Sequence, residues 1–362
     1  SDGMVKKKDA AAEKDKNKIN PEELLSCLKN KRPLDSKGLI VVLGEEDYYR
    51  KQIEAVIEDY VFQDIEPDSR EVTVIEKNTD LREITAVINT YPFFCGQSLL
   101  ILKDSKFFNL GKTPSEERKQ QLDKLAELLA DIPDYCTVFI SVAKLDKRTK
   151  LYKFLKSHAL LCECEELKPY NAQPWLEKLA EKYGAHLTYD AKMRLLEYLA
   201  PVDNVPMAIM EQEFAKLAVY TNGRSPWTVD DLEAVWVDLP EVSNFKLCDF
   251  ISEKKLPQVL EMLSVMKQRK VPLILTCGLI DYHLRKLARF QELMQSSHDI
   301  TMVGKEMGLH PFIAKKMQQQ CRNFSAASLI KAIIDVNRIN VDSRGDGRKY
   351  EDLEDVMVQL LH

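Results

Sequence analysis

Hydrophobic residues in the first half of the chain gather into short runs, and amphipathic segments separate these runs. Short apolar runs predict buried strands, and apolar residues spaced by three and four predict helices packed on them. Such alternation is typical of a parallel sheet that is covered on both faces, and it predicts an α/β domain over residues 21–168. The expected strands are residues 39–43, 71–75, 98–102, 137–142 and 160–163, and the expected helices are residues 46–60, 81–89, 115–130 and 150–157.

The strand signal stops after Pro169, and helical periodicity continues to the end of the chain. A first helical block is expected over residues 169–240, with helices at 173–183, 188–199, 204–220 and 229–235. A second helical block is expected over residues 241–362. In it, one helix that starts near Pro272 carries an apolar stripe: Leu273, Cys277, Ile280, Leu284, Leu287 and Phe290. The fold class is therefore α/β followed by all-α.

Residues 1–20 are lysine-rich and lack an aromatic residue or an apolar face, which predicts a disordered tail. They also lack the apolar segment of a secretory signal. The long uncharged stretch at residues 85–102 contains asparagine, threonine, proline, glycine and glutamine, so it is a poor membrane span. We expect a cytoplasmic protein with no membrane partner.

Composition excludes several classes of protein. With 12 glycines and 15 prolines in 362 residues, the chain is poor in the residues that turn-dense all-β folds need. A net charge of -5 gives no overall positive field, so a nucleic acid would have to be contacted through a local patch or through partners. The eight cysteines form no CxxC pair, which indicates reduced thiols rather than a disulfide framework.

The turn after the first strand is where a nucleotide-binding domain of this type would carry its phosphate loop, GxxxxGK[ST]. The sequence there is GEEDYYRK over residues 44–51, with Tyr49 at the position of the second glycine. Its carboxylates would repel phosphates rather than bind them. We interpret this segment as a degenerate, non-binding loop, with Gly44, Glu45, Glu46 and Tyr49 as its characteristic residues.

Two later segments resemble parts of a nucleotide site without completing one. Residues 111–113 read Gly-Lys-Thr but lack the first glycine of the motif, so a surface loop in which Thr113 or Ser115 caps the next helix is favoured. Asp104 follows the third strand, where a magnesium-site aspartate is often found. Without a phosphate loop, we interpret it as a residue of the turn at the strand end.

Other catalytic templates are missing from the sequence. It contains no GxSxG, HExxH or GxGxxG, and its six histidines show no metal-ligand spacing. Cys162 and Cys164 fall on one face of a strand, which favours buried thiols over a ligand pair. We therefore expect no catalytic residue, no metal and no cofactor.

An aromatic cluster stands in the turn before the third strand, where polar residues are usual; it reads TYPFFCG over residues 90–96. Pro92 must end the preceding helix and hold its neighbours extended. Two interpretations stay open: the phenylalanine rings fold back beneath the sheet, or they protrude as an apolar wedge at a binding site.

Residues 300–316 follow the order helix, glycine turn, helix, which a DNA-reading helix-turn-helix would also show. The second helix opens with Pro311, Phe312 and Ile313, whereas base reading needs polar side chains such as arginine or asparagine at these positions. A packing corner is therefore favoured, and DNA binding is kept as an alternative.

Several stretches together resemble the delta subunit family of bacterial DNA polymerase III. Each stretch is weak alone, but their order and spacing are jointly specific and cover nearly all of the ordered chain. They are LGEEDYYRKQ at 43–52, PFF at 92–94 before SLLIL at 98–102, LDKRTKLYK at 145–153, residues 211–220, and LHPFIAKK at 309–316.

The resemblance implies an AAA+ or RecA-like sheet domain without a working phosphate loop, then a helical lid domain and a C-terminal helical collar domain that assembles the clamp loader. It implies replication partners: the beta sliding clamp, the gamma/tau and delta prime loader subunits, and primed DNA within the assembled loader. Such a protein would bind the clamp through an apolar wedge and open the ring, and the wedge maps onto Thr90, Pro92, Phe93 and Phe94.

Such a chain would belong to a DNA-directed DNA polymerase, a nucleotidyltransferase complex, without a catalytic site of its own. Two alternatives remain at this point. One is a nucleotide-binding AAA+ ATPase of a related loader, and the other is the helix-turn-helix DNA-binding protein.

Overall fold

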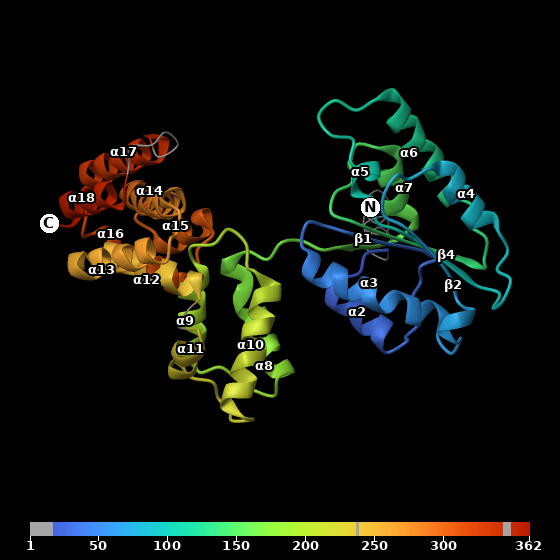
Figure 1. Cartoon of the computed structure of the whole chain (residues 1–362), viewed down its shortest axis with the longest axis horizontal. Helices are drawn as coiled ribbons and strands as arrows, with labels where there is room; N and C mark the ends of the chain where they lie inside the picture. Colours follow the sequence, from blue (N-terminus) through green and yellow to red (C-terminus); the bar gives the residue numbers. More distant parts are fainter. Residues whose placement is uncertain (1–16, 237–238, 343–348) are drawn as a thin grey trace, which may run out of the picture. The chain divides into compact units, whose positions relative to one another are not determined.

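A computed structural model describes residues 17–236, 239–342 and 349–362, and the side chains of all of these except residues 341–342. The chain divides into two compact units, one up to Glu166 and one from Leu167 onward (Figure 1). The first contains the sheet, and the second is helical. The domain boundary expected at residues 168 and 169 thus lies close to the division, while the two expected helical blocks share one unit.

The sheet has five parallel strands in the order β2-β3-β4-β1-β5, so the first strand lies between the fourth and the fifth. Each expected strand is present, with one residue added to the fourth. Their bounds are β1 (Leu39–Leu43), β2 (Glu71–Ile75), β3 (Ser98–Leu102), β4 (Cys136–Val142) and β5 (Leu160–Glu163).

Alternate residues of each strand enter two separate cores. Leu39 and Val41 face a core formed with α4 to α7, and Ile40 and Val42 face a core formed with α2 and α3. Figure 1 shows these helices on opposite faces of the sheet. Because both faces are covered, β1 and β3 are buried along their whole length. The helices are α2 (Pro21–Lys29), α3 (Asp47–Phe62), α4 (Leu81–Asn89), α5 (Ser105–Phe108), α6 (Glu116–Leu129) and α7 (Lys150–His158).

Side-chain caps fix where several of these helices begin. Asp80 caps α4 and Ser115 caps α6, each by accepting a main-chain hydrogen bond from the first turn. Asn20 caps α2 in the same way, with Pro21 in the first turn. The sequence did not lead us to expect α2 or the four-residue α5.

The predicted disordered tail lies, for residues 1–16, outside the described residues. Residues 17–19, however, run beside β5: the Ile19 amide donates to the Leu161 carbonyl at 3.1 Å, and the Leu161 amide donates to the Asn17 carbonyl at 2.9 Å. This short segment extends the sheet by one isolated parallel bridge at Lys18.

The second unit is built from helices alone among its described residues. The apolar stripe expected on one long helix is found on α14, where Cys277, Ile280, Leu284, Leu287 and Phe290 are fully buried. The helices are α8 (Ala172–Lys182), α9 (Tyr189–Leu199), α10 (Met207–Thr221), α11 (Val229–Val235), α12 (Pro240–Ser252), α13 (Leu256–Gln268), α14 (Leu273–Ser297), α15 (Ile300–Met307), α16 (Pro311–Cys321), α17 (Ala326–Asp342) and α18 (Tyr350–Leu361).

The helix, glycine turn, helix segment is a packing corner. Gly308 ends α15 in the left-handed conformation, and the His310 ring accepts a hydrogen bond from the Phe312 amide at the start of α16. Ile313 and Ala314 are buried in the core of the unit. The start of α16 therefore packs inward and does not present a base-reading surface.

Within the described ranges, no helix combines the length and the apolar character that a membrane crossing requires.

Candidate functional site

Gly44 is required by the packing of two strand ends. Its φ is +154°, and a Cβ placed on it would lie 1.9 Å from the carbonyl oxygen of Cys164. The Cys164 amide donates to the Leu43 carbonyl at 2.7 Å, so the chain after β5 is held directly against the end of β1. This glycine allows two main chains to approach each other.

The other characteristic residues of this loop, Glu45, Glu46 and Tyr49, make ion pairs and hydrogen bonds within the chain. Glu45 pairs with Lys144 at 3.0 Å, and Glu46 caps α3 by accepting from the Tyr48 amide at 3.0 Å. The Tyr49 hydroxyl donates to a carboxylate oxygen of Glu22 at 3.0 Å. These contacts are what an ordinary helix start makes, and they bring acidic groups to the place where a phosphate loop would present free amides.

A carboxylate occupies the centre of the sheet's carboxyl edge. Glu54 of α3 accepts from the Ser141 hydroxyl of β4 at 2.5 Å and pairs with Lys103 at 3.4 Å, just after β3. Arg50 lies 3.7 Å from the same carboxylate. The basic groups at this edge therefore already have an internal anion.

Asp104 has a structural role. Its carboxylate accepts from the Thr79 hydroxyl at 2.7 Å and from the amides of Lys106 and Phe107, and so it caps α5. Burial alone would raise the pKa of Asp104, but these hydrogen bonds stabilise the charged form and lower it overall. The interpretation of Asp104 as a strand-end turn residue agrees with this geometry.

The aromatic rings before β3 are exposed. Phe93 is 86% exposed and Phe94 is 71% exposed, with their rings edge to face at 5.1 Å. This arrangement excludes the interpretation in which they pack beneath the sheet. Two neighbouring exposed phenylalanines form an apolar projection of the kind that marks an interaction site.

The turn that carries these rings is anchored on both sides. Pro92, which the sequence analysis grouped with the wedge, is buried, so its ring stays against the protein. The Phe93 amide donates to a carboxylate oxygen of Glu71, at the start of β2, at 2.8 Å. Thr90 is exposed, and its hydroxyl donates to the Ala86 carbonyl at the end of α4. The structure thus brings Phe93 and Phe94 together at the tip and uses Pro92 and Thr90 at its base.

Tyr91 was not among the residues expected to form the wedge. Its side chain is 70% exposed, and its ring meets that of Tyr135 edge to face at 5.2 Å. The signal available in the sequence was its place inside the same aromatic cluster.

Two family models match this chain, one within each of its two units. The family model described as DNA polymerase III, delta subunit, matches residues 41–165, and the model for the C-terminal domain of the DNA polymerase III delta subunit matches residues 241–358. The chain belongs to the DNA polymerase III delta subunit family.

One curated relative and one solved structure extend this result. The chain is 26% identical to the DNA polymerase III subunit delta of Bacillus subtilis over 325 residues, which cover 88% of this chain and 91% of the relative. The structure of the Bacillus subtilis DNA clamp loader delta protein has a TM-score of 0.58 at 20% identity, covering 94% of this chain and 99% of that one. The sheet-then-helices fold class is thereby confirmed.

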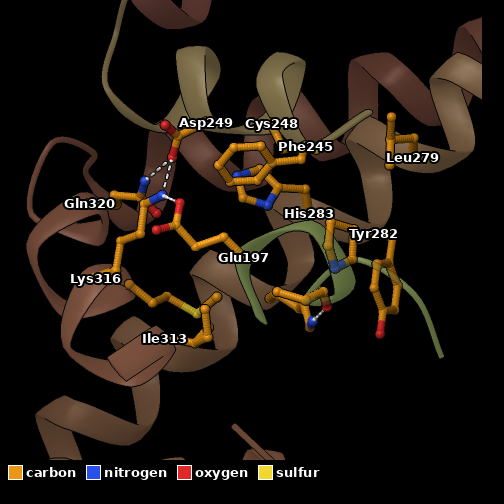
Figure 2. Close-up of a pocket in the computed structure, with 14 residues that line it drawn as sticks. Glu197, Phe245, Cys248, Asp249, Leu279, Tyr282, His283, Ile313, Lys316 and Gln320 are labelled. Atoms are coloured by element: carbon orange, nitrogen blue, oxygen red, sulfur yellow. Dashed lines mark hydrogen bonds and ion pairs between the residues drawn. The ribbon is translucent and has the colours of Figure 1, made fainter. Parts of the chain in front are cut away.

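The helical unit of this delta-family chain holds a small cavity of about 60 Å³, beside a cluster of partly buried charged side chains (Figure 2). Lys316 of α16 pairs with Glu197 of α9 at 2.6 Å and with Asp249 of α12 at 2.8 Å, and its ammonium lies 4.8 Å from the centre of the Phe245 ring. Gln320 donates to Asp249 as well, at 2.9 Å. These partners satisfy one another and join helices of the two helical blocks.

His283 lies in the same cluster. Its Nε2 is 2.5 Å from the Ser252 hydroxyl oxygen, and burial lowers the pKa of the His283 ring to about 4, with the Lys286 ammonium adding to the effect. The imidazole is therefore neutral at pH 7 and serves as a hydrogen-bonding group within the helical unit.

No group of three or more histidine, cysteine, aspartate or glutamate side chains is placed to hold a metal ion in the part of the delta-family chain that the structure describes.

Proposed function

We propose that this chain is the clamp-opening component of a DNA polymerase III clamp loader, and that it binds the sliding clamp through the exposed ring pair Phe93–Phe94. The single observation that carries the proposal is the exposure of these two rings on an anchored turn, 86% and 71%, in a chain of the delta subunit family. The name of the solved relative, a DNA clamp loader delta protein, supports the same assignment.

The mechanism we propose is preferential binding to the open form of the ring. Each phenylalanine that is fully buried in a partner contributes about 1.5 to 3 kcal/mol. Shifting a ring from about 1% open to about 99% open needs roughly 5.5 kcal/mol of preference for the open form. Two rings can therefore supply most of this energy only if they are buried in the open form and largely excluded from the closed form.

The remaining partners in this proposal are the gamma/tau and delta prime subunits, with primed DNA inside the assembled loader. The helices from α12 onward would supply the contacts with the other subunits, because this segment matches the family's C-terminal domain. ATP would act through those subunits. In this chain the corresponding edge of the sheet already holds the Glu54 carboxylate.

The test is a titration of purified sliding clamp with the full-length chain and its Phe93→Ala variant. We expect Phe93→Ala to weaken binding about a hundredfold and to leave thermal unfolding unchanged, because the ring makes little contact within the chain. Tyr189→Ala is the control, since Tyr189 is also exposed, at 67%, but lies on α9.

Unchanged affinity of the Phe93→Ala variant would contradict the wedge assignment. A saturable signal in a titration of the wild-type chain with ATP would instead favour the ATPase alternative.

A further inference from the structure

The projection before β3 carries a third exposed ring, that of Tyr91. Tyr91 and Phe93 stand on either side of buried Pro92, and both side chains face solvent, at 70% and 86% exposure. With Phe94, three of four consecutive residues expose an aromatic ring. Exposed apolar side chains are common singly on protein surfaces, whereas a contiguous group of this kind marks an interaction site.

Tyr91 has a firm support although it is exposed. Its ring meets that of Tyr135 edge to face, with 5.2 Å between centroids and 71° between planes. Tyr135 packs against the core beneath α4 to α7, and its carbonyl accepts from the Ser98 amide at 2.8 Å, where β3 begins. A ring held in this way loses little conformational freedom when a partner covers it, so more of the contact energy appears as affinity.

The Tyr91 ring contributes little to folding stability, which also favours a role in binding a partner. One edge-to-face pair accounts for the contact of Tyr91 with Tyr135, and most of its surface stays in water, so the side chain adds little to the stability of the sheet unit. Tyrosine is enriched among the residues that dominate binding energy at protein interfaces.

We infer that Tyr91 makes a second contact with the sliding clamp, beside the Phe93–Phe94 pair, and that Tyr135 is its positioning residue. This inference rests on the proposed function. The partner surface that fits is an apolar face of the clamp that continues from the site of the two phenylalanines. The two contacts are continuous on the surface, because Tyr91 is separated from Phe93 only by Pro92, which is buried.

The experiment measures the dissociation constant of the full-length chain and purified clamp for single variants. We expect Tyr91→Ala to raise it about tenfold and Tyr91→Phe to change it less than about threefold, because the ring makes the contact. Tyr189→Ala, an equally exposed tyrosine on α9, should leave it unchanged.

A double-mutant cycle tests the positioning role of Tyr135. Tyr135→Ala should weaken clamp binding in the wild-type background and have no further effect in the Tyr91→Ala background, because it acts through Tyr91. Tyr135→Phe should restore the wild-type affinity. Equal effects of Tyr135→Ala in both backgrounds would overturn this role, since a general loss of structure acts whether or not Tyr91 is present.

The outcomes separate this inference from the proposed function. If Phe93→Ala loses clamp binding while Tyr91→Ala binds like the wild type, the second contact is refuted and the wedge stands. If the wild-type chain does not bind the clamp, the proposed function fails and this inference fails with it.

Discussion

Glu54 carries a single carboxylate that Ser141, Lys103 and Arg50 all approach. By count from Gly44, Arg50 stands at the lysine position of a phosphate loop, so a cation is retained where a nucleotide would need one. In this chain the anion beside Arg50 is the carboxylate of Glu54, one turn further along the same helix. The sequence indicated that the loop is degenerate, but Glu54 could not be identified, because Lys103 and Ser141 reach it only through the order of the strands.

The residue His283 leads to a prediction about pH. Its pKa is about 4 in the folded chain, against 6.5 for an ordinary histidine. Between these values the unfolded chain binds a proton that the folded chain does not. The stabilisation is therefore complete above about pH 6.5 and is lost as the pH falls toward 4, by up to about 3 kcal/mol. Among the charged groups, Lys286 and Lys316 lower the pKa of the ring further, and Asp249 opposes them.

Tryptophan fluorescence during urea unfolding at pH 7 and pH 4.5 measures this effect. All three tryptophans, Trp175, Trp227 and Trp236, lie in the helical unit, so the signal reports that unit alone. His283→Gln should reduce the loss of stability between the two pH values. His298→Gln, at an exposed histidine, is the control and should not; an equal loss in wild type and His283→Gln would refute the prediction.

At the scale of elements, the strands were the most predictable part. β1 and β3 are apolar runs buried along their whole length, so composition alone marks them, whereas β2 is only partly buried and is recognised by its β-branched residues Val72, Thr73 and Val74. The short helix α5 was missed because four residues are too few to show a period, and its start depends on the Asp104 cap and on Thr79 from another loop. The helix α2 was missed although Asn20 and Pro21 form a recognisable start, because it directly follows the polar N-terminal segment.

The wedge illustrates the limit of sequence reasoning at the same scale. The aromatic cluster in this turn left two interpretations open, a wedge at a binding site and rings folded beneath the sheet, because the sequence did not say which rings face outward. That depends on Pro92 being buried and on the hydrogen bond between the Phe93 amide and Glu71, which is distant in sequence. The predicted wedge therefore included Pro92, whose ring is buried, and left out Tyr91, whose ring is exposed.

The junction between β1 and β5 gives a prediction at this scale. Gly44→Ala should destabilise the sheet unit by about 3 kcal/mol, because the new methyl group would overlap the Cys164 carbonyl and the backbone is in a region that favours glycine. Gly111→Ala is the control: its φ is also positive, at +68°, but nothing lies within 4 Å, so the cost should be about 1 kcal/mol.

Calorimetry of the full chain, compared with tryptophan fluorescence, checks this. The transition of the sheet unit should move to lower temperature in Gly44→Ala, while the tryptophan signal of the helical unit stays in place. Equal shifts for Gly44→Ala and Gly111→Ala would show that the Cys164 contact is unimportant.

At the scale of the whole molecule, the chain consists of two units that each have their own core. We predict that residues 1–166, produced alone, fold cooperatively and keep the clamp affinity of the full chain within about threefold, because the wedge and its supports all lie in this unit. Circular dichroism and a clamp titration measure the two properties. Residues 167–362 and the 1–166 fragment with Phe93→Ala are the controls, and neither should bind the clamp. A folded 1–166 fragment without affinity would show that the helical unit is needed for binding.

Residues 17–19 have a consequence for how the protein behaves at high concentration. Parallel sheets end in strands whose outward main-chain groups can template the addition of a foreign strand. At the β5 end of this sheet, the amide and carbonyl of Leu161 are already bonded to Ile19 and Asn17. Residues 17–19 thus cover the β5 edge of the sheet at Leu161, which disfavours strand addition by another molecule at this position.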